Sequence, residues 1–436
     1  MLSRVRGTRD IVDTRLMLFA INAITKQVQK YHFQHIITPI LEPVALFKRS
    51  LGQETDVVSK EMFIVGSSSS EKSDDIRLRQ GSERDLRSED LEICLRPEAT
   101  ASVVRAFIEE GIQTVPWKVF LFGSMFRYER PQKGRYREFY QCSMELIGAR
   151  SLAYDAQLLS MLDRLFRQTL KLEAYALHLN FLGCPEDRVL FKEQVALFLE
   201  ANLAALCETC IKRKDTNVLR VFDCKSETCQ QLYTKAPVLA DCFCEQCDIE
   251  WCELRHQLEE LSVPFVHMPR LVRGLDYYNK TVFEFVSPLL GAQSTFCGGG
   301  RYDQLVKELG AKEDQPSVGA AIGLDRLVLM LETVQYALDF SYEPALFVIV
   351  PVSEEQHSLA LQVADTLVRA DICVEVLFDG SVKAMMRKAD KSGAKAVLLI
   401  GRDEQEAGTV KIKQMQSGSE EIVKQIEVAR YIKALA

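Results

Sequence analysis

The order of apolar and polar residues divides the chain into stretches of different kinds. Residues 15–31 repeat apolar side chains every three or four positions, which predicts a helix. Residues 119–149 form two β-rich runs separated by a polar loop, which predicts a strand, a loop and a second strand. Residues 151–172 have the helical period again, and the pattern remains mainly helical to about residue 261. These stretches predict an α+β domain with an antiparallel sheet and a helical insertion.

The pattern changes after residue 344. The apolar runs ALFVIVPV, ICVEVLF and AVLLIG are short and continuous, as in buried strands, and helical stretches separate them. One helix is expected to begin at Ser353, where Gln356 completes a capping box, and another near Ser381. This alternation predicts a C-terminal α/β domain with a mixed sheet.

Polar side chains share faces of the two strands predicted within residues 119–149. Because strand side chains alternate, Arg127 and Glu129 should lie on one face of the first strand, and Gln141, Ser143 and Glu145 on one face of the second. A strand that packs on a core rarely carries such groups together unless they are paired or bind something. The pattern therefore favours a binding site over an exposed hairpin.

The loop between these strands is basic, with only Glu129 and Glu138 beside its cations. A basic hairpin tip suits phosphate contacts, although a solvated charged turn has the same composition. Its cations are Arg130, Lys133, Arg135 and Arg137.

Several segments resemble those of one family. FRYERPQKGRYREFYQ resembles motif 2 of the class II aminoacyl-tRNA synthetases, in the form found in histidyl-tRNA synthetases. HIITPILEP and SVGAAIGLDRLVLMLE resemble motifs 1 and 3, and LVRGLDYY and GGGRYD are similar to two signatures of the histidyl enzymes. RPEAT resembles their RPEGT segment, with Ala99 in place of glycine. Local pattern leaves a second interpretation of RPEAT open, in which Thr100 caps a helix and Glu98 favours its N-terminus.

The resemblance implies that ATP activates L-histidine to histidyl-adenylate with release of pyrophosphate, and that histidine then passes to tRNA(His). It assigns Arg127 to the α-phosphate, Arg326 to the triphosphate tail and Glu129 to the adenine amino group. Arg273 occupies the position of a catalytic arginine, and Mg²⁺ would offset the remaining charge. Motif 1 implies a homodimer.

The resemblance also implies a histidine site. Glu98, Thr100 and Gln141 would hold the α-ammonium group, and Glu145 and Tyr278 would bond the two imidazole nitrogens. Such a pocket discriminates against analogues that lack these nitrogens by a factor of about 10⁴ to 10⁵, because its own polar groups would be left unpaired. The complete expected histidine-binding set is Glu98, Thr100, Gln141, Glu145, Tyr277 and Tyr278.

The motifs predict four parts of the chain. Residues 1–170 form the first part of a catalytic core, residues 171–262 a helical, cysteine-rich insertion, residues 263–335 the second part of the core, and residues 344–436 an anticodon-binding domain. The loop tip with Gln132 and Lys133 would meet the acceptor end of the tRNA. Residues 66–90 are polar and low in complexity, and we interpret them as a loop or hairpin extension.

Cysteines are concentrated in the insertion. The chain has thirteen, and eight of them fall between Cys207 and Cys252. A tetrathiolate zinc site is conceivable there. No histidine lies between the first and the last of these cysteines, and their spacings are irregular, so the sequence does not favour zinc. The best candidate ligands are Cys224, Cys229, Cys244 and Cys247.

Bulk composition narrows the classes of protein. A chain of 436 residues with 47% hydrophobic and 26% charged residues suits two or three globular domains. The net charge of −7 argues against a wholesale nucleic-acid coat, but a tRNA-binding protein needs only a local basic track. No apolar run approaches a membrane span and the N-terminus lacks a signal core, so we expect a cytoplasmic protein.

Two alternatives share the fold class. One is a synthetase-like regulatory protein that binds histidine without charging tRNA, and the other is an RNA-binding or polymerase-accessory relative. The first tends to lose the arginines that this chain retains at 127, 273 and 326. The second would not keep LVRGLDYY or RPEAT, so the sequence disfavours both.

Overall fold

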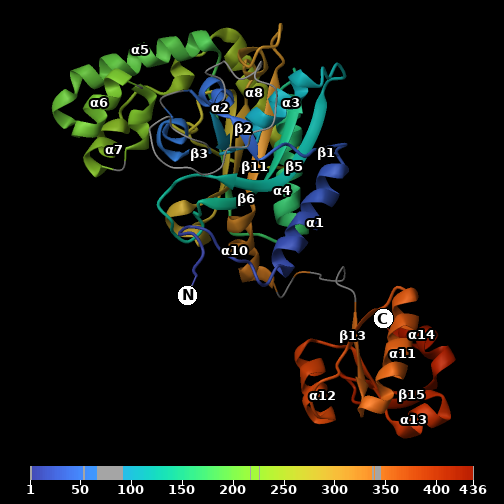
Figure 1. Ribbon diagram of the computed structural model, residues 1–436. Coiled ribbons are helices and arrows are strands. Elements are labelled where there is room, and N and C mark those ends of the chain that lie inside the picture. The colour runs from blue at the N-terminus through green and yellow to red at the C-terminus, as the bar shows by residue number, and fades with distance from the viewer. Residues whose placement is uncertain are drawn as a thin grey trace, which may run out of the picture. The chain divides into compact units, whose positions relative to one another are not determined.

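The computed structural model describes residues 2–52, 55–65, 92–216, 218–224, 226–335, 338 and 345–435. The chain divides into two units, Met1–Leu338 and Asp339–Ala436, and each is described by itself (Figure 1). The polar segment 66–90 lies outside the described residues.

An eight-stranded sheet forms the centre of the first unit, in the order β1-β5-β6-β11-β10-β9-β7-β8. The six inner strands are antiparallel, and the short strands β1 and β8 pair in parallel at the two edges. The predicted antiparallel α+β domain is therefore confirmed, with parallel pairing only at its edges. The strands are β1 (Gln34–His35), β5 (Trp117–Phe126), β6 (Glu138–Ile147), β7 (Ala176–Phe181), β8 (Val266–His267), β9 (Asn279–Val286), β10 (Thr295–Arg301) and β11 (Ser317–Gly323).

Helices with one apolar face pack around this sheet. Helix α1 buries Phe19, Ala20, Ile24 and Val28, as its helical period predicts, and it contacts α10. The other helices of the core are α2 (Val44–Leu51), α3 (Thr100–Glu109), α4 (Ala153–Arg164), α9 (Leu305–Glu308) and α10 (Leu324–Val334), and α1 spans Arg15–Gln29.

A small sheet of three strands stands beside α3, in the order β2-β4-β3. The segment HIITPILEP contributes the second residue of β1 and all of β2, each at the edge of its sheet, as expected of a run interrupted by Pro39. The strands are β2 (Leu41–Pro43), β3 (Phe63–Val65) and β4 (Ile93–Leu95).

The segment 171–262 is mainly helical, as predicted, but it begins with a strand of the large sheet. Strand β7 pairs with β9, and Leu177, Leu179 and Phe181 are buried at alternate positions. This two-residue period was visible in the sequence, and the helical interpretation missed it. The helices that follow are α5 (Pro185–Ala201), α6 (Glu208–Thr216), α7 (Glu227–Tyr233) and α8 (Glu245–Glu260).

The second unit is an α/β domain with a five-stranded mixed sheet, as predicted. Strand β12 pairs in parallel with β13 and β14, and the pairs β14-β15 and β15-β16 are antiparallel. The capping box of Ser353 and Gln356 is present, and Ser381 caps α12. The elements are β12 (Leu346–Pro351), α11 (His357–Arg369), β13 (Cys373–Val376), α12 (Val382–Lys391), β14 (Ala396–Ile400), α13 (Arg402–Ala407), β15 (Thr409–Gln414), β16 (Glu420–Lys424) and α14 (Val428–Leu435).

A buried ion pair joins β10 to α4. The side chain of Arg301 is 1% exposed and pairs with Asp155, which is fully buried. The same guanidinium donates to the carbonyl of Ala149 at 2.8 Å and to Asp303 at 3.1 Å. Every charge here has a partner, which is the condition under which a buried ion pair is tolerated.

Replacing Arg301 with alanine should destabilise the first unit by about 3–5 kcal/mol, because Asp155 would remain buried without its partner. Thermal and urea unfolding monitored by circular dichroism measure the change. The control is Arg15→Ala, which removes an exposed pair with Asp13 and should change stability by only about 0.5 kcal/mol. Equal effects of the two substitutions would contradict this account.

Candidate active site

A cavity of about 180 Å³ opens on the face of the large sheet, where β6, β10 and β11 meet the start of α3 and α10. Most side chains that the sequence singled out line it. Gln132, Lys133 and Glu145 are not among its lining residues. The predicted residues that the fold brings together are Glu98, Thr100, Arg127, Glu129, Gln141, Arg273, Tyr277, Tyr278 and Arg326.

The start of α3 corrects one prediction about the RPEAT segment. Ala99, not Thr100, is the N-cap residue, and the carboxylate of Glu98 accepts hydrogen bonds from the N–H groups of Thr100 (2.7 Å) and Ala101 (2.8 Å). The Thr100 hydroxyl instead donates to Glu145 at 2.8 Å. The Glu98 carboxylate therefore satisfies free N–H groups at the start of α3. The same side chain also lines the cavity.

Glu145 lies deeper than the residues that line the cavity. It is 1% exposed, and its carboxylate accepts hydrogen bonds from the hydroxyls of Thr100 and Tyr302. A side chain on Gly319 of the neighbouring strand would overlap this carboxylate, so glycine is required there. Burial raises the pKa of Glu145 to about 8. The carboxyl is therefore held behind Thr100, and Tyr302 is a partner that the GGGRYD segment already contained.

Aromatic side chains form one wall of the cavity. The rings of Tyr277 and Tyr278 are 4.6 Å apart between centroids, and Tyr302 packs against Tyr277 at 5.7 Å. The carbonyl of Tyr278 accepts a hydrogen bond from Arg188 at 3.0 Å. Burial raises the pKa of Tyr278 to about 12, so its hydroxyl is a donor at neutral pH.

Arginine side chains from different elements line the same cavity. Arg127 donates from Nε to the carbonyl of Pro97 at 3.0 Å, and Arg326 donates from Nε to the carbonyl of Gly134 at 2.9 Å. Burial, and then Arg135 and Arg127, lower the pKa of Arg326 to about 10. Burial also lowers the pKa of Arg127. Cations brought together out of water in this way favour an anion between them.

Arg127 and Glu129 do not share a strand face, which corrects the prediction. Strand β5 ends at Phe126, and the N–H of Arg127 already bonds the carbonyl of Arg137 at 2.9 Å in the loop. Both residues therefore lie beyond the end of the strand, where the alternation of side chains between two faces no longer applies. Glu129 pairs with Arg135, a loop residue whose role the sequence did not specify. By contrast, Gln141, Ser143 and Glu145 do alternate within β6 as predicted.

Arg273 occupies space left by a glycine. Its guanidinium pairs with Glu284 of β9, which also accepts a hydrogen bond from the Thr295 hydroxyl at 2.9 Å. A Cβ on Gly298 would lie 2.8 Å from Nη1 of Arg273. Burial opposes the charge of Arg273, but Glu284 acting together with Tyr278, Tyr277 and Cys297 outweighs it, so the pKa of the arginine is raised. Glu284 was missed, although it is the lone acid within the apolar run at the end of β9.

Gln132 and Lys133 lie at the exposed tip of the loop between β5 and β6. Paired backbone hydrogen bonds between Gln132 and Arg135, of 3.0 and 2.9 Å, close the turn. Gly134 has a φ of +74°, which favours glycine in this turn.

The four cysteines chosen from the sequence do not form one cluster. Cys224 and Cys229 group with Cys207 and Cys210, whereas Cys244 and Cys247 group with a different pair, Cys184 and Asp187. That candidate site is wrong, because sequence spacing identifies local pairs and not which pairs meet.

Among the described residues, no helix is long and apolar enough to cross a membrane.

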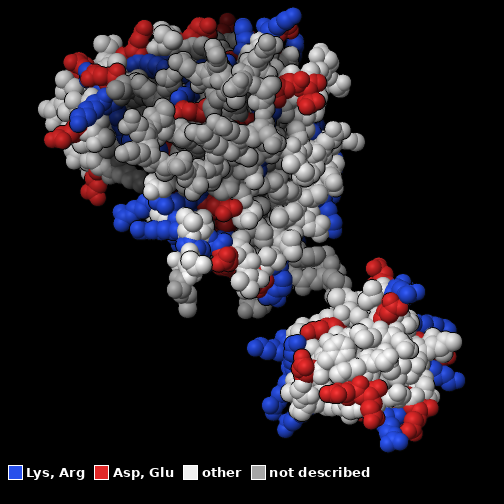
Figure 2. Space-filling view, viewed as in Figure 1, with Lys and Arg blue, Asp and Glu red and all other residues white. Residues whose placement is uncertain are grey.

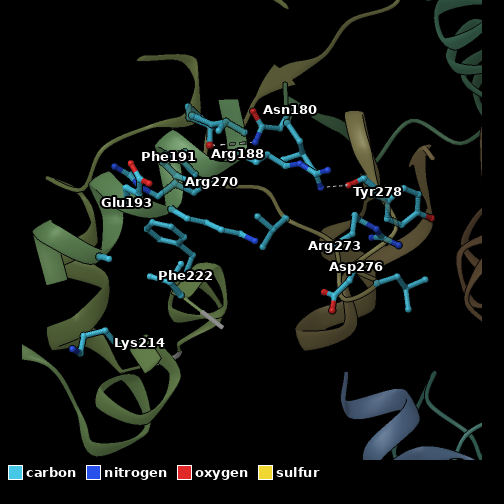
Figure 3. A pocket seen from close by; sticks show the side chains of 18 of the residues that line it. Asn180, Arg188, Phe191, Glu193, Lys214, Phe222, Arg270, Arg273, Asp276 and Tyr278 are labelled. Carbon is cyan, nitrogen blue, oxygen red and sulfur yellow. Dashed lines mark hydrogen bonds between the residues drawn. The ribbon is translucent and has the colours of Figure 1, made fainter. Parts of the chain in front are cut away.

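A second, larger cavity of about 570 Å³ adjoins the first and shares Arg273, Leu275 and Tyr278 with it. Figure 3 shows the hydrogen bond from Arg188 to Tyr278 in this cavity, with Arg273 and Asp276 near Tyr278 and Arg270 nearer Phe191. It extends toward α5 and α6, so the helical insertion borders the active-site region.

Comparisons with known proteins place this geometry in context. The family model described as "Histidyl-tRNA synthetase" matches residues 83–327, and the "Anticodon binding domain" model matches residues 347–435. A histidine–tRNA ligase of Nitratidesulfovibrio vulgaris is 40% identical over 434 residues, covering 98% of this chain and 97% of the relative. A histidine–tRNA ligase of Aquifex aeolicus is 37% identical over 432 residues, covering 98% of this chain and 100% of the relative.

Solved structures give the same picture. The crystal structure of apo histidyl-tRNA synthetase from S. aureus matches with a TM-score of 0.78 and 28% identity, over 99% of this chain and 100% of that one. A chain from Bacillus halodurans, described as an ATP phosphoribosyltransferase regulatory subunit/histidyl-tRNA synthetase, has a TM-score of 0.61 at 17% identity, over 92% and 98%. The second likeness concerns the fold alone.

The buried carboxyl of Glu145 should make stability depend on pH. Its pKa is about 8 in the folded chain and near its usual 4.5 when unfolded, so its favourable contribution is complete below pH 4.5 and is lost as pH rises through 8. Glu145→Gln should remove this loss, which has a slope of up to about 1.4 kcal/mol per pH unit. Unfolding by urea from pH 5 to pH 9 measures it.

The control for this experiment is Glu259→Gln, at an exposed position of α8. This variant should follow the pH dependence of the unsubstituted chain. If the Glu145→Gln curve runs parallel to that of the unsubstituted chain over the whole range, the carboxyl does not titrate as described.

Proposed function

The chain belongs to the histidyl-tRNA synthetase family, and we therefore propose that the cavity on its large sheet is where histidine and ATP react. The protein is an ATP-dependent histidine–tRNA ligase of translation, with the fold of a class II synthetase. Histidine, ATP and tRNA are its substrates, and Mg²⁺ enters the reaction with ATP, as in class II synthetases generally.

The observation that carries the proposal is that two chemically different sets of side chains line one cavity. The cationic set is Arg127, Arg273 and Arg326, and the other set is Glu98, Gln141 and the tyrosines. An amino acid with its ammonium group toward Glu98 would present its carboxylate to the arginines. Its position would then be set before the reaction begins, which is a major source of rate enhancement.

In the activation step, a carboxylate oxygen of histidine attacks the α-phosphorus of ATP. A bond forms between them, the bond to the bridging oxygen of pyrophosphate breaks, and pyrophosphate leaves. We assign Arg127 to the α-phosphate, Arg326 to the triphosphate tail and Arg273 to the region where carboxylate and phosphate meet. Negative charge grows on the phosphate oxygens, and fixed guanidinium groups stabilise it without reorganising.

For histidine recognition, Glu98, Thr100 and Gln141 hold the α-ammonium group and Tyr278 bonds the imidazole. Tyr277 supports the ring of Tyr278. Glu145 acts indirectly on the imidazole side of the site, because its carboxylate already accepts hydrogen bonds from Thr100 and Tyr302. Its proposed role is therefore one of positioning.

We assign the nucleotide base to a further residue of the cavity and the tRNA to surfaces outside it. Glu129 reads the adenine amino group, and the exposed tip with Gln132 and Lys133 meets the acceptor end. We propose that residues 1–170 and 263–335 together form the catalytic core, that residues 171–262 are an insertion, and that residues 344–436 bind the anticodon. In the last unit, Lys and Arg alternate with Asp and Glu over the surface (Figure 2), and α12 exposes Lys383, Arg387, Lys388 and Lys391.

We also propose a homodimer. The segment that resembles motif 1 exposes apolar side chains, with Ile37 84% exposed and Leu41 53% exposed. Neighbouring exposed apolar residues of this kind are typical of a surface that a partner covers.

Arg273→Ala should reduce histidine-dependent ATP–pyrophosphate exchange by roughly 10²- to 10³-fold, because one preorganised cation is lost from the transition state. Lys391→Ala, on the surface of α12, should leave the exchange unchanged. Histidine binding without exchange in the unsubstituted chain would support a regulatory protein instead.

Gly298→Ala should have a similar effect without removing any charge. The added Cβ would lie 2.8 Å from Arg273 Nη1 and displace the guanidinium, and a shift of about 1 Å can cost about 10²-fold in rate. The matched control is Gly274→Ala, whose Cβ would meet nothing within 4 Å. Single-turnover adenylate formation compares them, and equal rates for the two variants would refute the role of Gly298.

A further inference from the structure

Two groups of potential metal ligands lie in the helical insertion, outside the cavity that we assign to the reaction. The first consists of Cys207, Cys210, Cys224 and Cys229, whose sulfur atoms all lie within 4.8 Å of one another. The second consists of Cys184, Asp187, Cys244 and Cys247, whose ligand atoms satisfy the same limit.

Each group is assembled at the beginnings of helices. Cys184 is the N-cap residue of α5 and Asp187 lies in its first turn; Cys244 and Cys247 have the same positions on α8. In the first group, Cys207 directly precedes α6 and Cys229 lies in the first turn of α7. Thiolates are stabilised at helix N-termini, where N–H groups are free to donate.

Backbone N–H groups do point at these ligands. The N–H of Cys207 donates to the Cys229 sulfur at 3.3 Å and that of Ser226 to the Cys224 sulfur at 3.4 Å. In the second group the N–H of Cys244 donates to a carboxylate oxygen of Asp187 at 2.9 Å. Hydrogen bonds of this kind orient metal ligands and stabilise their charge.

The distances fit a tetrahedral ion better than disulfides. The sulfurs of Cys207 and Cys224 are 3.7 Å apart, close to the roughly 3.8 Å that separates two ligands around a Zn²⁺ with Zn–S bonds of about 2.3 Å. A disulfide requires about 2.05 Å, and all cysteines of the chain are free thiols. Four sulfurs that converge on one point also offer no preferred pairing.

The surroundings favour a structural ion. Cys210, Cys224 and Cys229 are buried, whereas α6, with the sequence ETCIKRKDT, offers few apolar side chains for a core. Segments with small cores are often held together by a metal. Four protein ligands per group leave no open position, which is the pattern of structural rather than catalytic zinc.

We propose that the helical insertion holds two structural Zn²⁺ ions, one bound by Cys207, Cys210, Cys224 and Cys229 and the other by Cys184, Asp187, Cys244 and Cys247. The thiols release their protons to solvent as the ions bind. Soft thiolate ligands select zinc over magnesium or calcium.

The second ion has a consequence for the proposed histidine site. Asp187 is followed by Arg188, which donates to the carbonyl of Tyr278 at 3.0 Å (Figure 3). The ion would fix the first turn of α5 and hence the position of Arg188. This consequence rests on the proposed function, whereas metal binding itself does not.

The test uses the full chain, expressed in zinc-supplemented medium and purified under reducing conditions without chelator. Elemental analysis should find two zinc ions per chain. Cys210→Ser and Cys247→Ser should each lose one, and Cys252→Ser, an exposed cysteine outside both groups, should keep two. Absence of zinc from the unsubstituted chain overturns the proposal, and a substitution without effect on zinc content overturns the site to which it belongs.

A second measurement on the unsubstituted chain avoids the risk that a variant misfolds. After removal of zinc, reconstitution with Co²⁺ should give the charge-transfer and d–d absorption of tetrahedral thiolate coordination for two ions. Alkylation without reduction followed by mass analysis should label the cysteines as thiols once metal is removed. Disulfides within either group, or an octahedral Co²⁺ spectrum, would overturn it.

The positioning role has its own measurement. In Cys247→Ser, the KM for histidine in pyrophosphate exchange should rise several-fold more than the KM for ATP, because Tyr278 belongs to the histidine side. Cys210→Ser, in the other group, should leave the two constants in their original ratio. If the chain lacks exchange activity altogether, zinc content still decides the metal proposal.

Discussion

Two ionisable side chains occupy space that exists only because adjacent strands carry glycine. Gly298 on β10 admits the guanidinium of Arg273, and Gly319 on β11 admits the carboxyl group of Glu145. These strands are paired with each other, so their register decides where both groups lie. A shift of β11 by one residue would bring Val318 or Ala320 to the place of Gly319, and a shift of β10 toward its C-terminal end would bring Cys297 to the place of Gly298. The chemistry of the cavity thus depends on the pairing of two strands.

The cavity on the same sheet is lined by more positive than negative side chains. The pKa values of Arg127 and Arg326 are lowered, first by burial, which means that the folded chain is not their most favourable environment. An anion such as a triphosphate supplies the missing charge. Because the guanidinium groups are held by carbonyls of Pro97 and Gly134 before any ligand arrives, little reorganisation is needed when one binds.

Local pattern was sufficient where a residue's role depends on its own element. The two strands around the basic loop and the alternation of Gln141, Ser143 and Glu145 could be predicted from the two-residue period alone. Prediction failed where the outcome depends on chain ends or distant contacts. Nothing in the pattern says that β5 stops at Phe126, and only the fold brings Tyr302 to Glu145. The resemblance to a known family identified the arginines, which residue type alone would have left as surface charges.

The helices α5 to α8 of the insertion lie between β7 and β8, and these two strands run parallel in the same sheet. Parallel neighbours cannot be joined by a tight hairpin, since the chain must travel back along the sheet before it can run in the same direction again. The helices α5 to α8 therefore form the crossover connection that this topology requires, whatever else they bind. A variant chain could have a shorter connection, but it could not lose the connection and keep β7 and β8 as parallel neighbours. The cysteine-rich segment is thus a long crossover connection, at a place where the fold requires a connection of this kind.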